Sequence, residues 1–146
     1  MGDEIDILLV EDNPNDVELT LHALRRHHPE LNVEVLRDGA EAIDRIFCTG
    51  DYDTRDIQNQ PRCILLDLKL PKVNGVEVLR QIKTDERTRG IPVVALTTST
   101  EARDIAESYQ LGVNSYISKP VDFEEFSEAV RKIGDYWLSL NRSTEL

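Results

Sequence analysis

Five polar side chains follow or close short apolar runs of the sequence, and their types could act together. Glu11 and Asp12 come after the first run, Asp67 after the third, Thr97 closes the fourth and Lys119 follows the fifth. Carboxylates that lie close together raise one another's pKa values unless a cation compensates them, and Mg²⁺ prefers oxygen ligands of this kind. An ammonium and a hydroxyl group beside them would hold phosphoryl oxygens. These residue types therefore predict a magnesium site that cradles a phosphoryl group.

The best candidate for the reactive group is Asp67. A carboxylate can attack phosphorus and form an aspartyl phosphate, and Asp67 stands alone at the end of the central apolar run 63–66. Considered by themselves, Glu11 and Asp12 could be the solvated end of a strand, which is the commoner role of an acidic pair. Asp67 and Lys119 at equivalent strand ends favour the metal site instead.

The elements that must position these side chains follow from the pattern of apolar residues. Short apolar runs typical of strands alternate with segments in which apolar residues recur every three or four positions, as in amphipathic helices. The polar stretch 48–60 is typical of a surface loop. The alternation predicts an α/β fold with a parallel sheet between two layers of helices, and a ligand site beyond the carboxyl ends of the strands. The expected strands are 5–10, 32–36, 63–66, 92–96 and 116–118, and the expected helices are about 14–28, 39–47, 74–83, 101–111 and 122–140.

Length, charge and cysteine content narrow the function further. The 146 residues are expected to form one domain, 1–146, with a core of about 5–140 and short tails at 1–4 and 141–146. The 28 acidic and 17 basic residues give a net charge of -11, which argues against nucleic-acid or anionic-membrane binding. Cys48 and Cys63 are too few for a disulfide framework, and the sequence shows neither a signal-peptide pattern nor a membrane-spanning run. We therefore expect a cytoplasmic protein.

In this order, the motifs resemble the receiver domain of two-component response regulators. The match to that family covers about residues 5–138. It rests on Glu11-Asp12, Asp67 with 68–71 (Leu-Lys-Leu-Pro) and 74–75 (Asn-Gly), Thr97, and 116–120 (Tyr-Ile-Ser-Lys-Pro). The resemblance implies a flavodoxin-like, CheY-like doubly wound sheet of five parallel strands in the order 2-1-3-4-5, with five helices. It also implies a cis peptide bond before Pro120. The implied role is a signalling phosphoprotein rather than an ordinary enzyme, with at most slow self-catalysed phosphorylation and dephosphorylation.

The same resemblance implies how the metal and the phosphoryl group are held. Asp67 is the phosphoacceptor and receives phosphate from a sensor histidine kinase. Asp12 and Asp67 ligate Mg²⁺ directly, Glu11 acts largely through water, and the backbone carbonyl of Lys69 completes the protein ligands. Because only its carbonyl is a ligand, we expect the Lys69 side chain to tune the lifetime of the phosphoryl group rather than the magnesium affinity.

The remaining implied residues respond to phosphorylation. Lys119 and Thr97 bind the phosphoryl oxygens, and Tyr116 is the aromatic partner that fills the space left when Thr97 moves. From the residues alone, Tyr116 could equally be a half-buried strand aromatic. Ser99, two residues after Thr97, is expected to flank the path of the hydrolytic water and to tune dephosphorylation together with Lys69.

A narrower resemblance points to the input of the signalling pathway. Four segments of the sequence resemble single-domain regulators of the cyanobacterial phytochrome type. They are residues 10–14 (Val-Glu-Asp-Asn-Pro), the polar insert before the third strand, 96–99 (Leu-Thr-Thr-Ser) and 136–138 (Tyr-Trp-Leu). This resemblance implies a phytochrome histidine kinase as the phosphodonor. A phosphorelay intermediate that passes phosphate to a histidine phosphotransfer protein would have the same residues, so this alternative stays open.

Two further alternatives belong to other classes of protein. A magnesium-dependent aspartyl-phosphate hydrolase of the haloacid dehalogenase type needs a second acid two residues after its nucleophile, at the end of the first strand. Here Lys69 occupies that position and Asp67 ends the third strand, so the pattern fails. A scaffold that is never phosphorylated is disfavoured by the intact set of acids and lysine.

The last expected helix suggests how the signal leaves the protein. A receiver that fills the whole chain must act through association, either with an unknown downstream protein or with a second copy. Trp137, Leu138 and Leu140 are expected to lie beyond the support of the short fifth strand. We therefore predict a homodimer contact there, because exposed aromatic surface at a helix end favours protein contacts.

Overall fold

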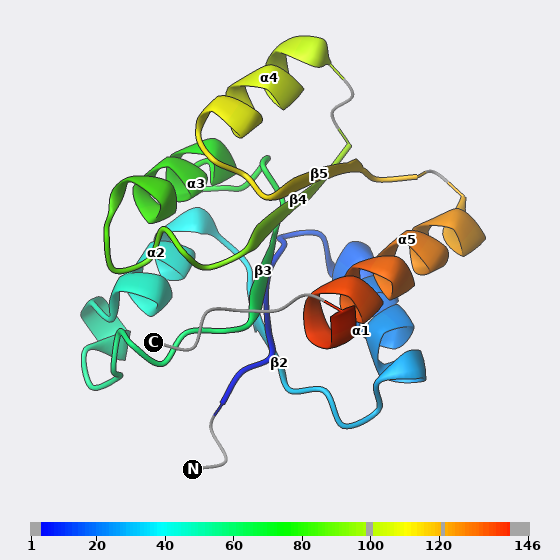
Figure 1. Cartoon of the computed structure of the whole chain (residues 1–146), viewed down its shortest axis with the longest axis horizontal. Helices are drawn as coiled ribbons and strands as arrows, with labels where there is room; N and C mark the ends of the chain where they lie inside the picture. The colour runs from blue at the N-terminus through cyan, green and yellow to red at the C-terminus, as the bar shows by residue number, and fades with distance from the viewer. Residues whose placement is uncertain (1–3, 99–100, 121, 141–146) are drawn as a thin grey trace.

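A five-stranded parallel sheet forms the centre of the molecule (Figure 1). The computed structural model describes residues 4–98, 101–120 and 122–140. The strands follow one another across the sheet in the order β2-β1-β3-β4-β5, so the predicted fold class and strand order are confirmed. Their bounds are β1 Ile7–Val10, β2 Val33–Leu36, β3 Cys63–Leu66, β4 Val93–Thr97 and β5 Ser115–Ser118.

Helices cover both faces of this sheet. Helices α1 and α5 pack together on one face, and α2 and α3 lie on the other with α4 beside β5 (Figure 1). At the first turns of α1, α2, α3 and α5 a side-chain oxygen accepts hydrogen bonds from backbone N–H groups, which fixes where these helices begin. The capping residues are Asn13, Asp38, Asn74 and Asp122. None of the helices within the described residues has the length and apolar character needed to cross a bilayer. The helices are α1 Pro14–His27, α2 Gly39–Phe47, α3 Gly75–Thr84, α4 Ala102–Gln110 and α5 Phe123–Asp135.

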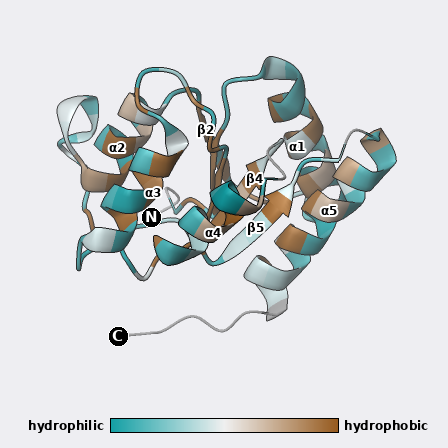
Figure 2. Ribbon diagram, turned by 90° about the horizontal axis from the view of Figure 1, so that it is seen from above, coloured by the Kyte–Doolittle hydropathy of each residue, from teal (hydrophilic) through white to brown (hydrophobic). Residues whose placement is uncertain are grey.

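The sheet separates two clusters of buried apolar side chains. Successive residues of a strand point to opposite faces, so Leu8 and Val10 of β1 pack with α2 and α3, whereas Ile7 and Leu9 pack with α1 and α5. The helices alternate apolar and polar segments, as expected of helices with one buried face (Figure 2). We call the two groups the α2–α3 cluster and the α1–α5 cluster.

Two segments differ from the sequence-based expectation. The expected irregular loop contains a short 3-10 helix, η1 Gly50–Tyr52, which is anchored to α2 by a hydrogen bond of 2.9 Å from Tyr52 Oη to Glu41 Oε1. Helix α5 is continued by a π-helical segment, η2 Tyr136–Leu140. Trp137 and Leu138 of η2 are half-buried and pack against the α1–α5 cluster. Their predicted contact with a second copy stays a prediction, and the side chain of Leu140 lies outside the described part of the structure.

Candidate functional site

The carboxyl ends of β1 and β3 bring three carboxylates together. The backbone N–H of Asp67 donates to the carbonyl of Val10 at 3.0 Å, which holds the two strand ends side by side. Ligand oxygens of Glu11, Asp12 and Asp67 lie within 4.8 Å of one another. Glu11 and Asp67 are buried and Asp12 is exposed, so the cluster opens to solvent on one side.

Lys119 reaches this cluster from the end of β5. Its backbone N–H donates to the carbonyl of Thr97 at 2.6 Å, and its Nζ lies 3.3 Å from Asp67 Oδ2 and in contact with Glu11 Oε1. Nζ also donates to Asp16 Oδ2 at 2.8 Å. Asp16 was not among the predicted site residues, because an acid in the first turn of a helix is explained by the helix dipole. Its role as a lysine partner becomes visible only once α1 is placed over the strand ends.

Burial and hydrogen bonds shift the pKa values of two groups of the site, Glu11 and Lys119. Burial raises the pKa of Glu11 to about 7; the hydrogen bond from Lys119 opposes this rise, while the neighbouring charge of Asp67 adds to it. Burial alone would lower the pKa of Lys119, but hydrogen bonds to Asp16 and Glu11 outweigh it and raise that pKa above its ordinary value. One ammonium therefore faces several carboxylates, and the site carries excess negative charge.

This donor set fits a divalent metal ion. All the available side-chain ligands at the cluster are carboxylate oxygens, which suit hard cations such as Mg²⁺. A dication would also relieve the repulsion among Glu11, Asp12 and Asp67 that Lys119 compensates only in part. The chemistry of the residues therefore matches the predicted kind of cofactor.

The segment after β3 holds the Asp67 carboxylate in place. The backbone N–H of Lys69 donates to Asp67 Oδ1 at 3.0 Å, and that of Gly75 donates to the Leu68 carbonyl at 3.1 Å. A Cβ atom on Gly75 would lie 2.2 Å from the Asp67 carbonyl oxygen, so only glycine allows α3 to begin this close to the site. The Lys69 side chain is exposed, and the use of its carbonyl as a metal ligand stays a prediction.

The expected switch residues lie on the two strands next to the site. Thr97 is fully buried at the end of β4 and pairs in register with Ser118 of β5. Tyr116 is half-buried against the α2–α3 cluster. Ser99 lies outside the described residues. The peptide bond between Lys119 and Pro120 is trans, so the expectation of a cis bond was wrong; most peptide bonds before proline are trans.

The combination of this fold and this site occurs in known proteins. The family model for the response regulator receiver domain matches residues 7–131. The chain belongs to this family. Receiver domains are signalling modules and generally not enzymes. The receiver is 48% identical over 139 residues to the probable methanogenesis regulatory protein FilR2 of Methanothrix harundinacea, and the match covers 94% of this chain and 86% of that protein.

Two solved structures share nearly the whole receiver. The phosphorylated cyanobacterial phytochrome response regulator RcpA is 39% identical, with a TM-score of 0.90 and coverage of 97% of this chain and 99% of that one. The Mn²⁺-bound form of response regulator Rcp1 is 36% identical, with a TM-score of 0.89 and the same two coverages, 97% and 99%. Rcp1 is a protein of Synechocystis sp..

Proposed function

We propose that this receiver is a phosphorylation switch in which Asp67 accepts a phosphoryl group from a sensor histidine kinase. The observation that carries the proposal is the position of Asp67. Its carboxylate lies at the end of the central strand, with Oδ2 3.3 Å from Lys119 Nζ and with Glu11 and Asp12 beside it. An acid surrounded in this way can act as a nucleophile while the charge that develops on phosphate is compensated.

The chain's own residues divide the reaction between them. An Asp67 oxygen attacks phosphorus, the new O–P bond forms as the N–P bond of the kinase phosphohistidine breaks, and the histidine nitrogen keeps the bonding pair. Lys119 and the Thr97 hydroxyl bind phosphoryl oxygens. Asp12, Asp67 and the Lys69 carbonyl would hold Mg²⁺, with Glu11 acting through water. The bound ion supplies positive charge against the phosphoryl oxygens.

Phosphorylation is proposed to rearrange the edge of the sheet. The new dianion draws in Lys119 and the buried Thr97 hydroxyl, and the space that Thr97 leaves can accept Tyr116. Because Tyr116 already packs half-buried beside the α2–α3 cluster, a small change in packing alters the surface formed by α4, β5 and α5. A local change of charge thus biases a surface with two arrangements.

The proposed phosphodonor is a phytochrome-type histidine kinase in the cytoplasm. The similarity to RcpA, which is a phytochrome response regulator, supports this input. The name of FilR2 concerns methanogenesis instead, so kinases with another stimulus belong among the candidate donors. A relay role, with transfer onward to a histidine phosphotransfer protein, shares the same site, and output through a second copy or a downstream protein remains part of the proposal.

Labelling of Asp67 tests the proposed function directly. Wild-type protein incubated with Mg²⁺ and either a phosphorylated kinase or acetyl phosphate should acquire one acid-stable, base-labile phosphoryl group. Asp67→Asn should acquire none, whereas Asp51→Asn, which changes an exposed aspartate, should behave like wild type. Undiminished labelling of Asp67→Asn would show that another residue is the acceptor. Following transfer from candidate kinases at short times would identify the donor, and Lys69→Ala should change the phosphoryl lifetime but not the magnesium affinity.

A further inference from the structure

Lys119 is the cation of the candidate site, and its ammonium is divided unequally among three carboxylates. Nζ donates to Glu11 Oε1 and, at 2.8 Å, to Asp16 Oδ2. Its third contact, with Asp67 Oδ2, is 3.3 Å long. Hydrogen bonds between an ammonium and a carboxylate are typically about 2.7–2.9 Å long. The ammonium is therefore bound to Glu11 and Asp16 and lies only at the edge of bonding distance from Asp67.

Asp16 reaches Lys119 because of the way α1 begins. The side chain of Asn13 accepts the backbone N–H groups of Asn15 and Asp16 at 2.9 and 3.3 Å, and this cap fixes the first turn of the helix. The Asp16 side chain is 25% exposed and that of Lys119 is 6% exposed. The pair thus lies at the border between the buried site and solvent.

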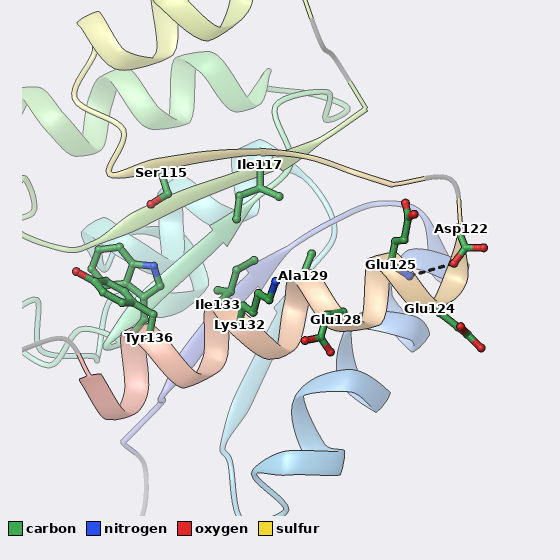
Figure 3. Close-up of a pocket in the computed structure, with 11 residues that line it drawn as sticks. Ser115, Ile117, Asp122, Glu124, Glu125, Glu128, Ala129, Lys132, Ile133 and Tyr136 are labelled. Atoms are coloured by element: carbon green, nitrogen blue, oxygen red, sulfur yellow. Dashed lines mark hydrogen bonds between the residues drawn. The ribbon is translucent and has the colours of Figure 1, made fainter.

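The acids that follow Lys119 in the sequence do not take part in this contact. They line a separate hollow beside β5, at the start of α5, as Figure 3 shows; these acids are Asp122, Glu124 and Glu125. Within the part of the chain that the structure describes, the ion pairs of Lys119 are those with Glu11, Asp16 and Asp67. Asp16 lies 103 positions away in the sequence, so its selection depends on the fold and not on closeness along the chain.

Asp16 differs from the other two partners in its relation to the metal site. Glu11 and Asp67 belong to the cluster whose ligand oxygens lie within 4.8 Å of one another, whereas Asp16 is not a member of that cluster in the described residues. Mg²⁺ at the cluster would compensate the charges of Glu11 and Asp67. The Asp16 carboxylate would still depend on Lys119, whose N–H groups a phosphoryl oxygen on Asp67 also needs.

We propose that Asp16 is a positioning residue that holds the Lys119 ammonium toward α1 and so opposes its contact with a phosphoryl group on Asp67. The inference rests on the proposed function, because it needs Asp67 to be the acceptor. As the ammonium moves toward a phosphoryl oxygen, its bond of 2.8 Å to Asp16 lengthens, and the two anions compete for it. Removal of the Asp16 charge should therefore favour the phosphorylated arrangement.

Beryllofluoride, which binds a carboxylate in the manner of a phosphoryl group, measures this competition at a fixed Mg²⁺ concentration. Calorimetry or fluorine NMR gives its Kd. Asp16→Asn should bind it about fivefold more tightly than wild type, a moderate effect because water screens a partly exposed ion pair. Glu18→Gln removes the same charge from an exposed position of α1 and should change the Kd by less than about twofold.

A second variant separates the contact with Lys119 from net charge and from the helix dipole. Asn15→Asp with Asp16→Asn moves the carboxylate one position along α1, which keeps the charge of the chain and an acid in the first turn. Successive helix residues point in directions about 100° apart, and Asn15 is exposed, so the moved carboxylate faces away from Lys119. This double variant should bind beryllofluoride as tightly as Asp16→Asn. Wild-type affinity in the double variant would show that charge alone sets the Kd, and would overturn the proposal.

The Nζ hydrogens of Lys119 give a readout that needs no phosphoryl group. Hydrogens that are bonded to carboxylates and shielded from solvent exchange slowly with water. In protein with isotope-labelled lysine, the Lys119 signal in the NMR spectrum is identified by its loss in Lys119→Arg. Exchange should be at least about threefold faster in Asp16→Asn and in the double variant than in wild type, and unchanged in Glu18→Gln. Equal exchange in wild type and Asp16→Asn would show that Asp16 does not hold the ammonium.

The same measurements distinguish failure of this inference from failure of the proposed function. Asp67→Asn should not bind beryllofluoride. If it binds as wild type does, or if wild type does not bind, Asp67 is not the acceptor and both proposals fail. If wild type binds, Asp67→Asn does not, and Asp16→Asn binds no more tightly than wild type, the proposed function stands and the role of Asp16 is wrong. Weaker binding by Asp16→Asn would also overturn it, because Asp16 would then guide Lys119 toward Asp67.

Discussion

Replacement of Glu11 by glutamine should stabilise the metal-free protein, and only at the higher pH values. The Glu11 carboxyl is buried and its pKa is raised from 4.5 to about 7. Below pH 4.5 it is protonated in both the folded and the unfolded protein and has no effect. As pH rises from there toward 7, the unfolded chain loses the proton and the folded one retains it, so stability falls. Above pH 7 the full penalty is present.

The size of the penalty follows from the distance between the two pKa values. At about 1.4 kcal/mol per pH unit, the rise from 4.5 to about 7 destabilises the ionised protein by about 3 kcal/mol. Glutamine has the shape of the protonated acid and does not titrate. Urea unfolding in the presence of a chelator should therefore give similar free energies for wild type and Glu11→Gln near about pH 4, and a gap of about 3 kcal/mol near about pH 8.

A control and a metal titration make this prediction specific. Glu86→Gln removes the same charge from an exposed position and should leave a gap of less than about 0.5 kcal/mol at every pH. Addition of Mg²⁺ at the higher pH should stabilise wild type more than Glu11→Gln, because a dication offsets the buried charge. A difference in the free energy of unfolding between wild type and Glu11→Gln that stays constant with pH would refute the reasoning.

Three other predictions concern packing and burial. Gly75→Ala should lower the free energy of unfolding, measured in urea, by about 1–3 kcal/mol, because the added Cβ would lie 2.2 Å from a backbone oxygen. Gly90→Ala should be close to neutral, because a Cβ there would have nothing within 4 Å. Equal effects of the two substitutions would contradict this prediction. Burial raises the pKa of the Cys63 thiol to about 12, so a thiol reagent at neutral pH should leave it unmodified in the native protein, and rapid reaction of both cysteines would show the strand to be accessible. Glu34→Gln should lower the free energy of unfolding, measured by heat or urea, by about 3 kcal/mol, because it leaves the buried Arg45 guanidinium without its carboxylate partner 2.6 Å away. A decrease of less than about 1 kcal/mol would mean that water reaches this ion pair.

The strands and most helices could be predicted because their signals are local. The β3 residues are apolar and fully buried, and polar residues with cap preferences precede the helices, so pattern and structure agree within a few residues. The 3-10 helix at Gly50–Tyr52 was missed because the polar stretch around it has no periodicity, and its anchor is a contact from Tyr52 to Glu41 on another element. Such an anchor exists only after α2 has formed.

The same distinction applies to the site. Glu11, Asp12 and Asp67 could be grouped from the sequence because parallel strands end at one edge of the sheet. Asp16 could not, because its contact of 2.8 Å with Lys119 depends on how α1 is rotated over that edge. The partial burial of Trp137 was not foreseen either, since it depends on η2 continuing α5 so that this side chain packs against the α1–α5 cluster.

The division of the core into two clusters has a consequence for how this sequence can change. Leu9 and Val10 are neighbours in the chain, yet they belong to clusters on opposite faces of the sheet. Free-energy changes add when the altered groups are distant and share no partners. Substitutions at positions of opposite clusters that lie more than about 7 Å apart should therefore be close to additive, whereas those of contacting residues within one cluster should be coupled. Evolution, or a designer, can thus rework the helical layer formed by α1 and α5 to suit a new partner while the other layer is inherited unchanged.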